Sequence, residues 1–155
     1  MRSPSDPFRL CIALALAVVA AAVASRAASR SEPSIEELKA RVAAANVGDR
    51  PKICMQIAQR QMGEADRKYA AGDSEKAQTA LADVVAFSEL ARDYSIQTHK
   101  YEKQTEIAVR GITRKLNDML HTLAHDDQRP VEDAIKHLQR VRDDLLSSMF
   151  PKGAK

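Results

Sequence analysis

His121, His125 and His137 are the residues whose chemistry and spacing could bind a metal ion. His121 and His125 stand four positions apart, and on a helix this spacing lets two imidazoles bind one ion. Asp126 and Asp127 follow directly. The glutamate of a His-Glu-x-x-His motif is missing, so the stretch does not predict a metalloprotease. If the apolar face of this helix meets its partners, the first two histidines point to solvent. We expect surface histidines, with a metal site as the alternative.

Cys54 is the second residue that could do chemistry, by forming an intermolecular disulfide or by a redox reaction. It lies between Ile53 and Ile57, where a small buried thiol is ordinary, and we expect burial. The sequence has no Cys-x-x-Cys-His motif for haem attachment, no glycine-rich phosphate loop and no nucleophile elbow. We therefore expect a protein that is not an enzyme and that needs no cofactor.

Residues 10–24 form a wholly apolar run that follows Arg2 and Arg9 and ends in small residues. A charged start, an apolar run and a small-x-small exit are typical of a secretory signal. As a helix the run rises about 22 Å, short of the ~30 Å hydrocarbon core of a membrane. We interpret residues 1–28 as a signal peptide cleaved after residue 24 or 27, and expect a periplasmic or secreted protein. An uncleaved, signal-anchored membrane form is the alternative.

Charge and composition characterise the chain that would remain after the signal peptide is cleaved. The chain has a net charge of +3, and residues 1–28 hold three arginines against one aspartate, so the remainder is close to neutral. A chain without one-sided charge does not resemble a nucleic-acid binder. The remainder keeps one cysteine, which excludes an intrachain disulfide, and it has no tryptophan. Its apolar residues are mainly Ala, Leu, Ile, Val and Met, which favour helices.

Sparse helix breakers divide the remainder into elements. Residues 29–33 are small, charged and proline-containing, and are interpreted as a flexible leader. Ser34 and Glu37 form a capping box, which predicts a first helix to about residue 46. Pro51 opens a second helix that Gly72 ends. Asp73 caps the next helix, and so tight a turn predicts an antiparallel hairpin.

The stretch 73–125 has no proline and a single glycine, and its apolar residues keep a 3-4 spacing. We expect one long helix, with a break near His99–Lys103 as the alternative because the middle is polar. Charged residues there, among them Glu106, are interpreted as i, i+4 ion pairs on an exposed face. A sharp turn at 126–130 then opens the last helix. The fold class is all-α: antiparallel helical hairpins on one long central helix, an elongated three- to four-helix bundle over 34–150, followed by a disordered tail at 151–155.

Two resemblances add to this interpretation. The pattern Tyr69-x-x-Gly72-Asp73-x-x-x-Ala77-x-x-x-Leu81 resembles the centre of a tetratricopeptide-type hairpin, although no second copy follows at 34 residues. The chain from residue 50 to residue 150 also resembles small exported bacterial helical proteins of unassigned activity. The features that match are the turn at 69–77, Thr105-Glu106-Ile107-Ala108, and Asp143-Asp144-Leu145-Leu146 before Met149-Phe150. The resemblance implies a localisation and a fold, and no chemistry.

The function that these observations predict is that of an extracytoplasmic interaction or scaffold module. We expect a protein partner or a homodimer through helix faces, because the long 3-4 seam exceeds what the flanking helices cover. We expect no nucleic-acid partner, and membrane contact only if the signal stays uncleaved. The alternative function is metal binding by an exported helical bundle through His121, His125 and His137.

Overall fold

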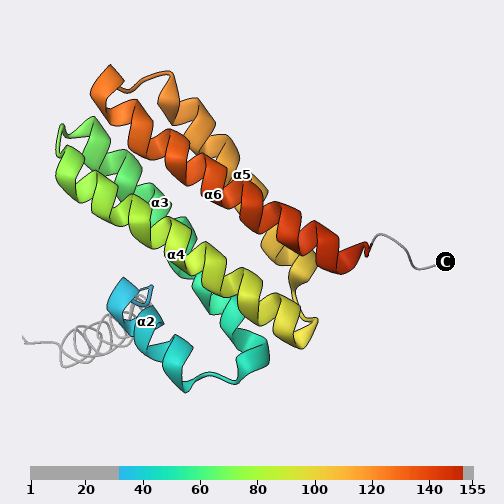
Figure 1. The fold of residues 1–155 in the computed structure, drawn as a ribbon. Helices are drawn as coiled ribbons and strands as arrows, with labels where there is room; N and C mark the ends of the chain where they lie inside the picture. The colour runs from blue at the N-terminus through green and yellow to red at the C-terminus, as the bar shows by residue number, and fades with distance from the viewer. Residues whose placement is uncertain (1–31, 152–155) are drawn as a thin grey trace, which may run out of the picture. The chain divides into compact units, whose positions relative to one another are not determined.

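A computed structural model describes residues 32–151, and within that range it contains helices and no strand (Figure 1). The elements are α2 (Ile35–Ala44), a short 3-10 turn η1 (Val47–Asp49), α3 (Arg50–Ala70), α4 (Ser74–Thr98), α5 (Glu102–Leu120) and α6 (His125–Met149). The all-α fold class is thereby confirmed. The expected signal peptide, most of the leader and the end of the tail lie outside the described residues. No helix in the described part of the chain combines the length and apolar character needed to cross a membrane.

The predicted helix ends near the amino side are present. Ser34 Oγ accepts a hydrogen bond from the amide of Glu37 at 3.1 Å, and Glu37 Oε2 accepts from the amide of Ser34 at 2.8 Å. Gly72 adopts a φ of 75°, a left-handed conformation that glycine takes without steric cost. Asp73 then caps α4 by accepting from the amide of Lys76 at 3.4 Å. The predicted antiparallel hairpin of α3 and α4 is confirmed.

The expected single helix over 73–125 is wrong, because the chain breaks between Thr98 and Glu102. His99 and Tyr101 have φ values of 52° and 62°, and two left-handed residues so close together end the helix and redirect the chain. Ser95 and Thr105 are both buried, and their hydroxyls lie 3.0 Å apart across the junction. These two polar side chains therefore satisfy each other inside the protein, and the contact joins the end of α4 to the start of α5. The break falls inside the window named as the alternative.

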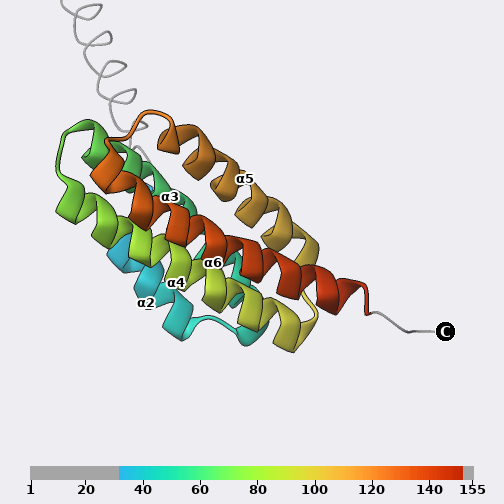
Figure 2. The same cartoon turned by 45° about the horizontal axis from the view of Figure 1, so that its top comes forward.

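Because of this break, the hairpin of α5 and α6 lies beside the hairpin of α3 and α4 and does not extend it (Figures 1 and 2). The expected bundle of antiparallel hairpins is confirmed, but in the described residues it is not built on one long central helix. α4 packs against α6, and α3 runs next to α5. One apolar core lies between the two hairpins and takes residues from all four helices, for example Met62, Val84, Leu116 and Leu138.

The second turn is also placed differently from the expectation. α6 begins at His125, whereas we expected its start near Pro130. The turn occupies the residues just before it, where Gln128 Nε2 donates to the carbonyl of Leu123 at 3.2 Å. Asp126 and Asp127 lie in the first turn of α6, and carboxylates are favourable there because they face the positive end of the helix dipole. Pro130 follows so close to this start that only one helical hydrogen bond is lost.

The short helix α2 docks across the α3–α4 hairpin. Leu38 is its one buried residue and is 1% exposed. Lys39 Nζ lies 3.2 Å from Asp83 Oδ2 of α4 and 5.8 Å from the centre of the Phe87 ring. Arg50 ties the end of α2 to α4, since its Nε donates to the carbonyl of Ala45 at 3.2 Å and its guanidinium lies 5.2 Å from the Tyr94 ring centre. The outer faces of α3 and α4 on this side are thereby covered.

Candidate functional site

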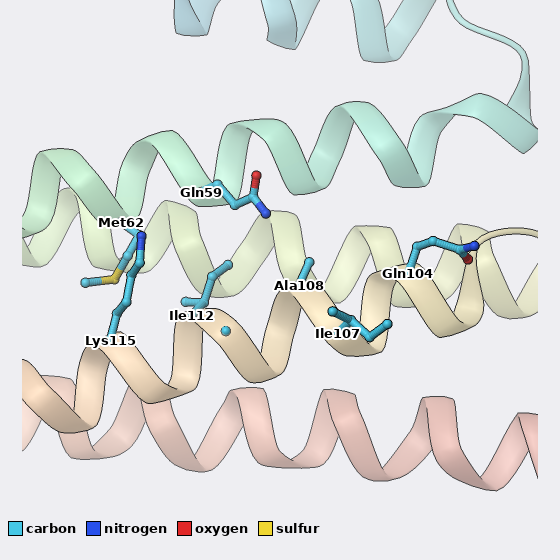
Figure 3. A pocket seen from close by; sticks show the side chains of 8 residues that line it. Gln59, Met62, Gln104, Ile107, Ala108, Ile112 and Lys115 are labelled. Carbon is cyan, nitrogen blue, oxygen red and sulfur yellow. The ribbon is translucent and has the colours of Figure 1, made fainter.

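A groove runs between α3 and α5, the two parallel neighbours of the bundle. Its larger part has a volume of about 650 Å³ and is lined by Gln59, Met62, Gln104, Ile107, Ala108, Gly111, Ile112 and Lys115 (Figure 3). A second part of about 400 Å³ is lined by Met62, Gly63, Asp66, Lys115, Asp118, Met119 and Thr122. The two parts are adjacent, since Met62 and Lys115 line both, and we call them together the α3–α5 groove.

The floor of the groove is the outer side of the core. Met62, Ile112 and Met119 line the groove and belong to the buried core cluster. Ile107 stands on its α5 edge and is 48% exposed, although isoleucine is usually buried. Methionine side chains are flexible and adapt to different apolar partners. The surface between α3 and α5 is therefore apolar, deformable and open to solvent.

Two glycines widen this groove. Gly63 and Gly111 are the glycines within the α-helices of the described chain, and each lines one part of the groove. A Cβ atom built on either would have no heavy atom within 4 Å. Glycine inside a helix costs about 0.5–1 kcal/mol relative to alanine. No described residue packs so closely that either position must be a glycine. Both positions are therefore open to an approaching partner.

Cations flank Ile107 on the outer face of α5, beside the groove, whose own charged lining residues on α5 are Lys115 and Asp118. Lys103, Arg110 and Arg114 are exposed and follow the spacing that places residues on one stripe of a helix. Arg110 Nη2 lies 3.7 Å from Glu106 Oε2, whereas neither Arg114 nor Lys103 forms an ion pair with any described residue. Lys115 also forms no such ion pair and extends from α5 toward Met62 (Figure 3). At the other end of the groove, the negative charges are those of Asp66 and Asp118.

Glu106 holds α5 against α6 beside this edge. Its side chain is 9% exposed, so it is not part of an exposed ladder as the sequence suggested. Arg142 Nε donates to Glu106 Oε1 at 2.7 Å. A carboxylate that is this buried needs such a charged partner, because leaving it unpaired would be costly. Glu106 therefore pairs with Arg142 and Arg110, and it leaves Lys103 and Arg114 without an ion pair to a described residue.

The three candidate metal ligands lie apart from the groove. His121 caps the carboxyl end of α5 and His125 opens α6, so a turn separates them and they do not share one helix face as expected. Both are exposed. His137 lies farther along α6, with its Nδ1 3.2 Å from Glu89 Oε1 of α4. In the described residues no group of three or more His, Cys, Asp and Glu side chains is placed to hold a metal ion.

Cys54 lies in the core and has no solvent exposure, which confirms the expected burial. Burial raises the pKa of its thiol from 9.0 to about 11, because the thiolate would lose its hydration. A thiol that is both covered and protonated is a poor nucleophile. The structure thus assigns Cys54 to packing.

Comparisons with protein-family models, with curated proteins and with solved structures found no match. The resemblances to a tetratricopeptide-type hairpin and to small exported helical proteins stay predictions. The candidate site therefore rests on geometry alone. The sequence analysis missed it, although the mid-helix glycines Gly63 and Gly111 were a signal, since a glycine inside a helical pattern often has a packing or functional reason.

Proposed function

We propose that this chain is an exported, non-enzymatic protein-interaction module that binds a protein partner in the α3–α5 groove. The observation that carries the proposal is the groove itself: an apolar floor, an exposed Ile107 and two glycines without neighbours on one side of the bundle. Exposed apolar surface with a polar rim is typical of sites where proteins bind one another. Helix pairs commonly offer such grooves to a partner segment.

A different protein is a better candidate for the partner than a second copy of this chain. The homodimer was expected because the 3-4 seam of residues 73–125 seemed too long for its neighbours. In the bundle that seam is internal: Val84 and Ala91 of α4 and Val109 and Leu116 of α5 share one core. Apolar surface stays open in the α3–α5 groove, where only the outer sides of the seam residues Ile112 and Met119 are reached.

Site-specific cross-linking tests the interaction proposal. A photoreactive amino acid at Ile107 is expected to capture a defined protein in cells, and the same group at Gln139, an exposed position of α6, is expected not to. Adding Gly111→Trp to the Ile107 probe fills the groove and should abolish the adduct, whereas Gln139→Trp should leave it unchanged. Equal capture from Ile107 and Gln139, or none from Ile107, contradicts the proposal.

The export proposal rests on residues 1–28, whose charged start, apolar run and small-residue exit are typical of a signal peptide. It predicts a mature chain that begins at Ser25 or Ala28 and is found outside the cytoplasm. Cell fractionation followed by mass spectrometry of the amino-terminal peptide measures this. A chain that keeps Met1 and stays with the membrane would instead support the signal-anchored alternative.

A further inference from the structure

We infer that the partner segment is an amphipathic α-helix with acidic residues along the edge that faces α5. This inference rests on the proposed interaction at the groove and specifies its occupant. Three observations carry it: the walls of the groove are helices, glycines open it at two points, and Lys103, Arg114 and Lys115 of α5 form no ion pair with a described residue.

The walls favour a helix over an extended segment. The backbone N–H and C=O groups within α3 and α5 are bonded inside their own helices, so they offer no edge to which a strand could pair. A bound helix brings its own satisfied backbone, whereas an extended segment would bury unpaired polar groups. Gly63 and Gly111 let a helix backbone approach closely at two points. From Gln104 to Thr122 the groove follows α5 for about 27 Å, which a helix of about 18 residues spans.

The apolar floor of the groove indicates which apolar face the partner helix presents. Ile107, Ile112 and Met119 succeed one another along α5, and Met62 completes the floor from α3. A helix that lies between two others presents apolar residues at i, i+3, i+4 and i+7 to such a surface. Leucine-sized side chains at those positions would cover Ile107 and the two methionines.

The charged residues around the groove indicate which charges the edges of the partner helix carry. Lys103 and Arg114 on the α5 edge, and Lys115 inside the groove, form no ion pair with a described residue. Glutamates on the facing edge of the partner would pair with them without first breaking an existing pair. Asp66 and Asp118 lie at the other end of the groove, so the partner is acidic only over the half that ends at Lys115. We expect a lysine or arginine where the partner passes the two aspartates.

This inference is tested by measuring the binding of a peptide to the full chain, in the form in which it is isolated from cells. The probe is a fluorescent 18-residue helical peptide with leucines at i, i+3, i+4 and i+7, glutamates on one edge and a terminal lysine. The control peptide has lysines in place of the glutamates. Fluorescence anisotropy is expected to show binding of the acidic peptide alone, and weaker binding as added salt screens the charges.

Variants locate the binding site. Arg114→Glu together with Lys115→Glu should weaken binding of the acidic peptide at least about fivefold, since each exposed pair contributes a small but measurable amount. Lys136→Glu together with Arg140→Glu makes the same charge change on α6 and should leave binding unchanged. Gly111→Trp should abolish binding, and circular dichroism should show that this variant stays helical.

The outcomes separate this inference from the proposed function. Equal binding of the lysine and glutamate peptides, or acidic-peptide binding that Gly111→Trp does not change, overturns the acidic-helix partner. Light scattering that shows the chain to be a dimer, lost on Gly111→Trp, overturns it as well and assigns the groove to a second copy. If the peptides fail while the Ile107 probe still captures a protein, only the helix inference falls. If the Ile107 probe also captures nothing, the interaction proposal falls with it.

Discussion

Arg142 Nε of α6 donates a 2.7 Å hydrogen bond to Oε1 of Glu106, a carboxylate of α5 that is 9% exposed. The Arg142 side chain is 43% exposed, so most of the cost of burying this pair falls on the carboxylate. The pair joins two helices of one hairpin and stands beside the basic stripe of α5. It therefore contributes both to the stability of the fold and to the charge of the groove edge.

Removing this arginine should destabilise the protein. Arg142→Ala leaves Glu106 with Arg110 Nη2 at 3.7 Å, and we expect the free energy of unfolding to fall by about 1–3 kcal/mol. Urea denaturation measures the change. Arg140→Ala, at an exposed neighbour without an ion pair, should cost less than about 0.5 kcal/mol. Adding Glu106→Leu to Arg142→Ala should recover part of the lost free energy of unfolding. If it recovers none, the unpaired carboxylate is not the cause of the destabilisation.

The glycines of the groove should be suboptimal for stability. Gly63→Ala and Gly111→Ala are each expected to stabilise the fold by about 0.5–1 kcal/mol, because the new methyl groups meet no atom and the helices gain propensity. Gly72→Ala is the matched contrast: its φ of 75° disfavours alanine, and we expect a loss of about 1–2 kcal/mol. Thermal unfolding of the three variants tests this. A loss at Gly63 or Gly111 would mean that the groove is already filled.

The raised pKa of Cys54 makes stability depend on alkaline pH. The folded thiol has a pKa of about 11 against an ordinary 9.0, so the folded protein holds this proton more tightly than the unfolded chain does. The stabilising contribution is complete below pH 9, and it is lost as pH rises toward 11, by about 2–3 kcal/mol in all. Urea denaturation between pH 8.5 and 10.5 should therefore show a steeper decline for the natural chain than for Cys54→Ala. Parallel declines would contradict the assignment.

Helix α2 should depend on one side chain. Leu38 is its single buried residue, and a ten-residue helix is only marginally stable alone in water. Leu38→Ala should therefore release α2 while the two hairpins stay folded, with an expected cost of about 2–4 kcal/mol. Amide hydrogen exchange should speed up over Ile35–Ala44 and stay slow in α6. Lys39→Ala, which removes two partly exposed ion pairs and a ring contact, should change the exchange much less.

Local chemistry explains which parts of the fold were predictable from sequence. The capping box at Ser34 and the glycine turn at Gly72 act within a few residues, so their patterns identify them. The break at 99–101 carries no glycine or proline, and only the polar character of the stretch around it favoured a break in the sequence. Its cause is a contact between Ser95 and Thr105 together with two strained backbone positions, and neither is visible in a periodic pattern. Glu106 was misplaced for the same reason, since its partner Arg142 comes close only after the chain reverses.

The candidate site was less predictable than the fold. Its two walls lie far apart in sequence, and they become neighbours only because the chain turns back between α4 and α5. Spacing along a single helix could not reveal that Ile107 and Met62 line the same groove. The spacing of the histidines was misleading in the opposite way: a helix was assumed through residues that form a turn, so His121 caps the end of α5 and His125 begins α6.

The junction at 99–101 also makes the protein divisible. Residues 50–98 and 102–149 are two hairpins, each formed by a continuous stretch of chain, and the link between them is short and exposed. Contacts within a hairpin are local in sequence, which favours rapid folding, and the first can form before the second has been synthesised. Severing the link at Lys100 breaks no α-helix, and the shared core still joins the two fragments. The bundle is thus a natural pair of complementing halves.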